Sequence, residues 1–374
     1  MDKPYSPGLE GIIAGESSIC EVDEETGNMT YWGYDLEELA ERASFEEVIY
    51  LLLKGDLPNR QQLDVFSNEL CKNRTIPTSL FDLYKTFPYK TDPMDILRTY
   101  VSIVGIHDPE TCDTSPEGLK RKALRLTAQI PTMIASIYRL RGGMTIFEPK
   151  AGVSHVENFF AMLTGNLPDP LVEKAMNVSL ILYAEHEFNA STFSARVTAS
   201  TLSDFYSAMT SSIGTLKGSL HGGANERVME MLLQIGEESK AEKWIRNALA
   251  KKQRIPGFGH RVYKNGDARS RVIERYCKAL GEKTGQTKWY NMSKTIERVV
   301  KEEKGFFPNL DFYSASTYYM VGLPIPLYTP IFVMSRVVGW AAHIIEQQSN
   351  NRLIRPRSVY IGPSSKPFVS LEQR

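Results

Sequence analysis

Helix start and stop signals recur along this chain and restrict it to a fold built mainly from helices. Ser44 followed by Glu47, and Ser154 followed by Glu157, are capping boxes, in which side chains satisfy the first free N–H groups of a helix. Each box precedes an apolar stretch that a glycine and a proline close. The regular alternation of strands and helices that builds a parallel sheet is absent from the sequence. The sequence therefore predicts a mainly α-helical protein.

The clearest strand material lies near the N-terminus. Residues 18–22 and 29–32 are short extended runs on either side of the turn residues 25–28, which predicts a small β-hairpin. Farther along, residues 224–304 carry shorter and more charged helical segments than the residues before them. Residues 323–326, Leu-Pro-Ile-Pro, have the composition of a hinge. The shift in composition marks a candidate second domain.

Composition and charge argue against several classes of function. Of the 374 residues, 42% are hydrophobic and 24% charged, and 44 Lys and Arg balance 44 Asp and Glu. Without net charge, bulk attraction to nucleic acid or to an anionic membrane is not expected. The N-terminus shows no apolar signal segment, and no run reaches the length of a membrane span. The cysteines are sparse and widely spaced, so we expect reduced thiols in a cytoplasmic protein.

A histidine in a glycine-rich turn is the first candidate for chemistry. Residues 218–227 read Gly-Ser-Leu-His-Gly-Gly-Ala-Asn-Glu-Arg and run into a segment with helical apolar spacing. The free N–H groups of that helix would point back at His221 and disfavour a cationic imidazole. We therefore expect His221 to be neutral and to donate a hydrogen bond. Taken alone, a histidine in such a turn is often an ordinary loop residue.

Two further residues complete a candidate acid–base site. His260 lies in a similar turn, Pro-Gly-Phe-Gly-His-Arg at 256–261, and Asp311 stands at the start of a predicted helix in the phenylalanine-rich stretch 306–312. Burial among phenylalanines would raise the pKa of this carboxyl, whereas a helix N-terminus would lower it, and the sequence leaves the balance open. Two histidines and a carboxylate, each at a backbone turn, have the composition of an acid–base site.

Arginines near these turns are candidates for anion binding. Arg336 lies in the apolar run 330–340, where a guanidinium needs an anionic partner, and bidentate capture of a carboxylate would supply one. Arg269 stands beside Arg271 at a predicted helix start and could equally belong to a solvated face. The basic residues between 251 and 264 could likewise be solvated, or could hold phosphates beside the Gly-Phe-Gly turn.

Other catalytic templates do not fit. Residues 257–259, Gly-Phe-Gly, lack the rest of the dinucleotide fingerprint, and the chain has no phosphate-binding P-loop. His186 would need a histidine at position 190 to form a helical zinc site, and Ala190 stands there. Because the spacing of the histidines carries no metal-ligand signature, we expect no metal.

Taken together, these motifs make the chain similar to the citrate synthases of the shorter bacterial and archaeal type and to the closely related 2-methylcitrate synthases. The resemblance runs nearly end to end, with one departure at Trp32, where a basic residue is expected. It rests on ordered blocks, among them Ala-Glu-His-Glu-Phe-Asn-Ala-Ser-Thr at 184–192, His-Gly-Gly-Ala-Asn-Glu at 221–226, Pro-Gly-Phe-Gly-His-Arg-Val-Tyr at 256–263, Asn-Leu-Asp-Phe-Tyr at 309–313 and Arg-Pro-Arg-Ser at 355–358.

The resemblance implies an all-α, two-domain fold and a homodimer. Residues 1–221 would form the first part of a large helical domain, and residues 322–374 its return segment and C-terminal arm. A smaller domain, residues 222–321, would close over the substrates. The resemblance also implies that oxaloacetate reacts with acetyl-CoA or propionyl-CoA, so that the CoA thioester is a substrate and no cofactor is required.

Roles for individual residues follow from the resemblance as well. Asp311 would remove a proton from the acyl carbon of the thioester, His221 would hydrogen-bond the oxygen of the resulting enol, and His260 would polarise the ketone of oxaloacetate. The expected oxaloacetate ligands are His186, Arg269, Arg336 and, from the neighbouring subunit, Arg355. The expected CoA ligands are Arg254, Gly257, Gly259, Arg261 and Lys264.

Two alternatives to acetyl-CoA condensation stay open. A preference for propionyl-CoA would make the product 2-methylcitrate, and one methylene gives only ~1–3 kcal/mol of discrimination. The other alternative, from a different class, is a non-catalytic helical protein that binds CoA or carboxylates. The intact acid–base positions argue against this second alternative.

Overall fold

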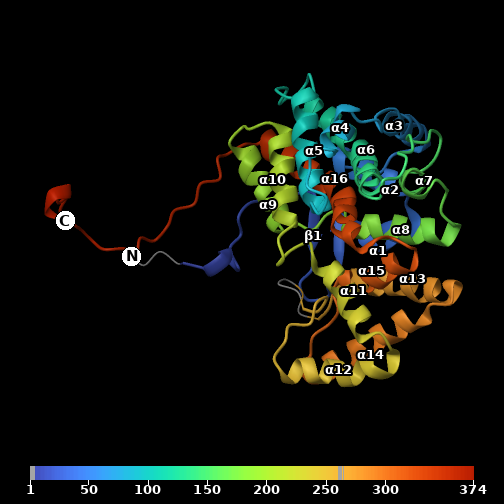
Figure 1. The fold of residues 1–374 in the computed structure, drawn as a ribbon. Coiled ribbons are helices and arrows are strands. Elements are labelled where there is room, and N and C mark those ends of the chain that lie inside the picture. Colours follow the sequence, from blue (N-terminus) through green and yellow to red (C-terminus); the bar gives the residue numbers. More distant parts are fainter. Residues whose placement is uncertain (1–4, 260–262, 264) are drawn as a thin grey trace.

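A computed structural model describes residues 5–259, 263 and 265–374, and these residues form a mainly helical molecule with one small sheet (Figure 1). The sheet contains β1 (Cys20–Val22), β2 (Met29–Tyr31) and β3 (Tyr34–Asp35), all antiparallel and in that order. Strands β1 and β2 are the predicted hairpin, which is confirmed. The third strand, only two residues long, was not predicted.

Helices account for most of the remaining described chain. Before the first glycine-rich turn they are α1 (Leu36–Arg42), α2 (Phe45–Lys54), α3 (Arg60–Lys72), α4 (Ser79–Tyr84), α5 (Pro93–His107), α6 (Pro116–Arg141), α7 (His155–Thr164), α8 (Pro170–Tyr183), α9 (Ala190–Ser200) and α10 (Phe205–Leu216). After it follow α11 (Ala224–Ile235), α12 (Glu238–Ala250), α13 (Ala268–Thr284), α14 (Thr287–Lys304), α15 (Leu310–Met320) and α16 (Tyr328–Ser349). Single 3-10 turns lie at Pro7–Leu9, Ile325–Leu327 and Leu371–Gln373. The prediction of an all-α fold is confirmed.

Both predicted capping boxes start helices. The Ser44 side chain accepts the N–H of Glu47, whose carboxylate accepts the N–H of Ser44, and the same exchange opens α7. Each of the two helices ends at a glycine in the left-handed conformation, with φ of 88° at Gly55 and 86° at Gly165. Local sequence therefore determines where these helices begin and end.

The apolar helix α16 runs through the core. It packs against α6, α8, α9 and α10, and its side chains are buried along nearly the whole length. By length and composition the stretch Ile325–Ser349 could cross a bilayer, the one such stretch in the described part of the chain. However, 89% of its most apolar window is buried inside the protein, which is the environment of a core helix.

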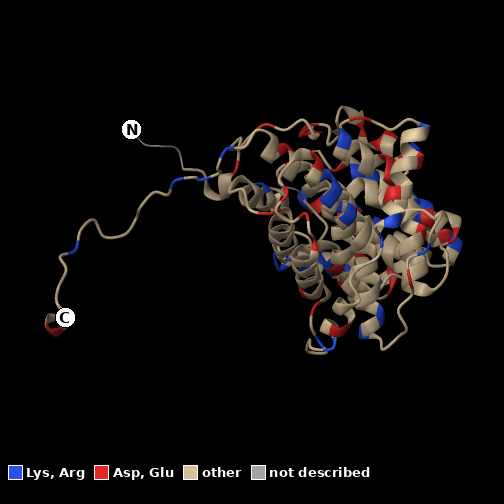
Figure 2. Ribbon diagram, turned by 90° about the horizontal axis from the view of Figure 1, so that it is seen from above, with Lys and Arg blue, Asp and Glu red and all other residues tan. Residues whose placement is uncertain are grey.

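The later helices gather at one end of the molecule. In Figure 1, α11 to α15 lie below α8 and α16, with α12 and α14 farthest from the core. The domain boundaries at 222 and 321 stay a prediction. Beside α9 and α10, the chain from 350 onward is extended and mostly exposed, and it runs away from the body (Figures 1 and 2). In the view of Figure 2, basic and acidic residues are interspersed over the helices, as the balanced net charge suggests.

Candidate active site

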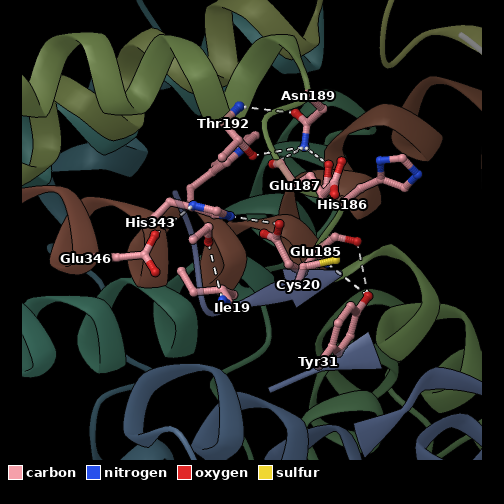
Figure 3. A network of polar contacts seen from close by, with 12 residues as sticks. Ile19, Cys20, Tyr31, Glu185, His186, Glu187, Asn189, Thr192, His343 and Glu346 are labelled. Atoms are coloured by element: carbon pink, nitrogen blue, oxygen red, sulfur yellow. Dashed lines mark hydrogen bonds and ion pairs between the residues drawn. The ribbon is translucent and has the colours of Figure 1, made fainter. Parts of the chain in front are cut away.

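The turn between α8 and α9 is the segment around which the predicted site residues gather. It begins where α8 ends at Tyr183, and it ends at Asn189, whose side chain accepts the N–H of Thr192 and caps α9. Within it, Glu187 adopts a left-handed φ of 49°. This turn carries His186, a predicted oxaloacetate ligand, and Figure 3 shows it beside the buried pair of Glu185 and His343.

Helix α16 holds this turn through side chains on successive helical turns. Arg336 donates from Nε to the carbonyl oxygen of Tyr183 (2.6 Å), and Trp340 donates to the hydroxyl of Ser191 (3.1 Å). His343 donates from Nε2 to Glu185 (2.8 Å), because its Nδ1 must accept from Arg196. The spacing from 336 to 340 to 343 places all three side chains on one face of α16. One helix face therefore contacts the segment from 183 to 191 at three points.

His186 is buried in this turn and reaches toward the small sheet. Its Nε2 pairs with the hydroxyl of Tyr263 at 2.6 Å, and that hydroxyl also lies 3.0 Å from the sulfur of Met29 in β2. Tyr263 in turn packs its ring near the guanidinium of Arg269, 5.8 Å from the ring centroid. The predicted ligands His186 and Arg269 therefore lie on either side of one tyrosine.

His221 occupies the predicted glycine turn. The N–H of Gly222 donates to the carbonyl of Leu216 (2.8 Å), and a Cβ at position 222 would lie 2.6 Å from that oxygen, so glycine is required there. The Nε2 atom of His221 accepts the backbone N–H of Ser191 (3.3 Å) and lies 2.8 Å from its hydroxyl. Since Nε2 accepts from a backbone donor, these hydrogen bonds assign the ring proton to Nδ1.

The prediction that His221 is neutral agrees with its surroundings, and the structure adds two causes that the sequence did not indicate. Burial lowers the pKa of His221 to about 4, and the positive charge of Arg336 lowers it further. The helix N-terminus that meets the ring belongs to α9, through the N–H of Ser191, rather than to α11, which follows the turn in sequence. The ring is thus a neutral donor at neutral pH.

Asp311 lies in the first turn of α15, where Asn309 caps the helix by accepting the N–H of Asp311 (3.1 Å). Burial raises the pKa of Asp311 to about 6, although the hydrogen bond from Tyr183 (2.6 Å) and the charge of Arg269 oppose the rise. The balance that the sequence left open is therefore decided by desolvation. Of the phenylalanines expected to desolvate the carboxylate, Phe306 is 55% exposed, whereas Phe312 is fully buried.

The Gly-Phe-Gly turn runs beside the start of α15. The carbonyl of Gly257 accepts the N–H of Asn309 (2.9 Å), and the N–H of Gly259 donates to the carbonyl of Phe307 (3.1 Å). Gly257 has a φ of 79°, and a Cβ there would lie 2.8 Å from Val228, so the position demands glycine. This pairing brings the predicted CoA-binding turn next to Asp311.

Three predicted residues on this turn, His260, Arg261 and Lys264, lie outside the described residues. Arg254, which precedes the turn, is exposed. Arg355 lies on the C-terminal segment after α16, where it is exposed. No group of three or more His, Cys, Asp or Glu side chains within 5–259, 263 and 265–374 could hold a metal ion. The four cysteines, all in described segments, are unpaired.

The two arginines predicted to bind carboxylates are both buried. Arg269 is 6% exposed, which rules out the solvated-face alternative, and it forms a two-bond ion pair with Asp267. Arg336 is 2% exposed, and no carboxylate in the described part of the chain lies within 4.0 Å of it. A buried guanidinium without an ion-pair partner favours an anionic ligand.

Tyr183 and Phe332 are among the site residues that were not predicted. Tyr183 donates to Asp311, and Phe332 packs against the rings of Tyr183 (4.5 Å between centroids) and His221 (6.5 Å), with Arg336 over its face. Phe332 precedes Arg336 by one helical turn, so helical spacing could have indicated it. Tyr183 ends an apolar helix and is indistinguishable from a core residue in the sequence. Together they connect His221, Asp311 and Arg336 in one cluster.

Known proteins match this chain over nearly its whole length. The family model described as citrate synthase, C-terminal domain, matches residues 8–357. The chain is 48% identical to citrate synthase 2 of Bacillus subtilis, covering 98% of both chains, and 43% identical to 2-methylcitrate synthase 1 of Corynebacterium glutamicum, covering 100% of this chain and 99% of that one. Among solved structures, the citrate synthase of Thermoplasma acidophilum in a ternary complex with carboxymethyl coenzyme A and oxaloacetate matches with a TM-score of 0.94, at 32% identity and 99% and 100% coverage.

Proposed function

The chain belongs to the citrate synthase family, and we propose that it condenses acetyl-CoA with oxaloacetate to give citrate and free CoA. The observation that carries the proposal is the cluster around Tyr183. It joins a neutral histidine, a carboxylate whose pKa is raised to about 6, and buried Arg336. These are the groups that a carbon–carbon condensation of a thioester with a keto acid requires.

In the proposed reaction, Asp311 removes a proton from the methyl carbon of acetyl-CoA. A carboxylate with a raised pKa is a stronger base than an ordinary one, and it is still ionised at neutral pH. Negative charge then develops on the thioester oxygen, where the Nδ1 proton of His221 donates a hydrogen bond. Loss of one such donor typically costs ~3–4 kcal/mol of transition-state stabilisation.

The enol carbon then attacks the ketone of oxaloacetate, and water hydrolyses the resulting citryl thioester. We assign polarisation of the ketone to His260, from the family resemblance. His186, Arg269 and Arg336 would hold the oxaloacetate carboxylates, and the burial of both guanidiniums supports this role. The CoA moiety would lie along the turn with Arg254, Gly257, Gly259, Arg261 and Lys264. The CoA thioester is a substrate in this scheme, and no cofactor takes part.

The assembly and location of the protein are also proposed. We propose a homodimer in which Arg355 of one protomer enters the site of its partner, because the tail that carries Arg355 is extended and exposed in the single chain. We propose a cytoplasmic enzyme that acts without nucleic acid or membrane, in keeping with four unpaired cysteines and a net charge of zero.

The acyl group is the open part of the substrate assignment. Relatives named citrate synthase and 2-methylcitrate synthase match this chain at 48% and 43% identity, a difference too small to choose between acetyl-CoA and propionyl-CoA. Initial rates of CoA release, measured with a thiol dye, oxaloacetate and each thioester, decide between them. We expect a higher kcat/KM with acetyl-CoA, and a clear preference for propionyl-CoA would instead assign 2-methylcitrate synthesis.

The same assay tests whether the protein is an enzyme at all. A non-catalytic protein that binds CoA or carboxylates would release no CoA from any short acyl-CoA in the presence of oxaloacetate. That result would overturn the proposed condensation for both thioesters.

A further inference from the structure

Asp267 is a buried carboxylate to which the sequence assigned no role. It is 3% exposed and stands directly before α13, where its Oδ1 accepts the backbone N–H of Arg269 (3.1 Å). An aspartate in this position is an ordinary helix N-cap. The remaining contacts of the carboxylate go beyond that role.

The same carboxylate also caps a second helix. Its Oδ2 accepts the N–H of Leu310 (3.0 Å), the first residue of α15. In addition, both of its oxygens bind the Arg269 side chain, Oδ1 at Nε and Oδ2 at Nη2, each at 2.9 Å. One carboxylate therefore accepts four hydrogen bonds from two helix N-termini and one guanidinium.

The two helices that meet at this carboxylate both deliver site residues. Arg269 is the second residue of α13, and Asp311 is the second residue of α15. We propose that Asp267 is a positioning residue that holds Arg269, as a ligand of oxaloacetate, and Asp311, as the base, in one fixed arrangement. The proposal rests on the condensation reaction proposed above and adds a residue to its machinery.

The bidentate geometry leaves part of the guanidinium for the substrate. Because Nε and Nη2 of Arg269 face Asp267, only Nη1 and the outward N–H of Nη2 remain, and Nη1 lies 3.5 Å from the carbonyl of Leu182. An arginine fixed in this way needs little reorganisation when a carboxylate ligand binds. A rotation of the guanidinium away from Asp267 would break both hydrogen bonds of the ion pair and leave the buried carboxylate without its counter-charge.

Asp267 also offsets the effect of the Arg269 charge on the pKa of Asp311, the proposed base. Within the described part of the chain, the charged and titratable groups that act on Asp311 are Tyr183 from α8, Arg336 from α16, Tyr318 within α15, and the pair Arg269 and Asp267. The guanidinium of Arg269 lowers the pKa of Asp311, whereas the carboxylate of Asp267 raises it. Without Asp267, the field of Arg269 would act on Asp311 uncompensated and make it a weaker base.

The variant Asp267→Asn tests this role, because the shape is retained and the charge is lost. We expect kcat/KM for oxaloacetate to fall about 10- to 100-fold, since charge-assisted hydrogen bonds to Arg269 are weakened. We also expect the acid limb of the kcat–pH profile to move to lower pH by about half a unit or more. A helix cap with no other role would lower stability without moving that limb.

A matched control is Asp204→Asn, which removes an N-cap aspartate from α10, distant from the site. It should lower the midpoint of thermal unfolding and leave the pH profile in place. If Asp267→Asn does not fold, Asp267→Ser, which keeps a cap oxygen but not the charge, is measured in the same way. An unmoved acid limb with unchanged kcat/KM in the folded variant would overturn the proposal, and so would loss of folding in both variants.

The wild-type rate separates this inference from the proposed function. If the wild-type protein releases no CoA from either thioester, the condensation itself is wrong. If the wild type turns over and Asp267→Asn behaves like Asp204→Asn, only the positioning role fails.

Discussion

Asp311 and His221 carry pKa shifts in opposite directions, and the shifts give them different tasks. Burial raises the pKa of the carboxyl to about 6 and lowers that of the imidazole to about 4. The histidine is uncharged at any pH well above 4, and the aspartate is mostly ionised above pH 6. At neutral pH both conditions hold. An ionised base and a neutral donor in one cluster are the combination that proton removal from carbon and stabilisation of an enol need.

Tyr183 should set the pH at which the base becomes active. Activity in the wild type is expected to fall as the pH drops through about 6, because Asp311 takes up a proton there, while His221 titrates too low to contribute. The hydroxyl of Tyr183 stabilises the ionised carboxylate. In Tyr183→Phe the pKa of Asp311 should therefore rise, and the acid limb of kcat should move to higher pH by about one unit.

The control for this experiment is Tyr100→Phe, which removes a buried hydroxyl bound to the carbonyl of Leu80, away from the site. It should leave the kcat–pH profile unchanged. An identical acid limb in Tyr183→Phe and wild type would show that the hydrogen bond to Asp311 does not tune the base.

Sequence reasoning found the residues whose chemistry is unusual for their neighbourhood. His221 and Asp311 stand at turns, and Arg336 is a charge in an apolar run, so each was visible without coordinates. Tyr183 and Asp267 were not found. The first looks like the end of a core helix and the second like a helix cap, and only the packing of α8, α13 and α15 gives them further partners.

At the scale of elements, α16 aligns the site by its close approach to the turn between α8 and α9. Gly339 lies one turn after Arg336, and a Cβ there would lie 2.2 Å from the carbonyl oxygen of Ala184 and 2.5 Å from Oε2 of Glu185. A backbone oxygen at that distance cannot move aside as a flexible side chain could. The glycine thus permits the contact through which α16 holds the segment 183–191.

Gly339→Ala should therefore separate α16 from the turn. We expect a loss of about 1–3 kcal/mol in the free energy of unfolding, as for other overpacked cores, together with weaker oxaloacetate binding. Urea unfolding and calorimetric titration with oxaloacetate measure the two effects. Gly214→Ala in α10 is the control, since its nearest neighbour, Arg98, lies at an ordinary 3.7 Å. Equal stability and affinity in the two variants would contradict the role given to Gly339.

Element boundaries were predictable where local chemistry determines them. The capping boxes and terminal glycines marked α2 and α7, and the turn at 25–28 marked the hairpin. The need for Gly339 depends on a segment distant in sequence, the turn at Ala184 and Glu185. Strand β3 pairs with the neighbouring β2 but is only two residues long, which leaves no strand pattern in the sequence. The contact of His221 with the start of α9 was not predicted, because α9 and the turn at 221 are neighbours only in the folded chain.

At the scale of the whole molecule, the exposed tail predicts active sites shared between protomers. Asp311→Asn and Arg355→Leu should each be inactive alone. The first variant lacks the base, and the second lacks the arginine that is proposed to enter the site of the partner subunit. In a mixed dimer, one site would combine an intact Asp311 with an intact Arg355. Random reassociation makes half of the dimers mixed, so co-refolding should restore about a quarter of wild-type activity.

The control is Asp311→Asn refolded with itself, which should stay inactive. No gain of activity in the mixture of Asp311→Asn and Arg355→Leu, with both variants dimeric, would contradict the shared site.

The most direct test of the central claim separates binding from chemistry at Asp311. The claim is that side chains distant in sequence form one site, in which Arg269 and Arg336 bind oxaloacetate and Asp311 acts only on the thioester. Asp311→Asn should bind oxaloacetate in calorimetric titration as wild type does, and its rate of CoA release should fall about 10²- to 10⁴-fold or more. An Asp311→Asn protein that still releases CoA at close to the wild-type rate would contradict the account.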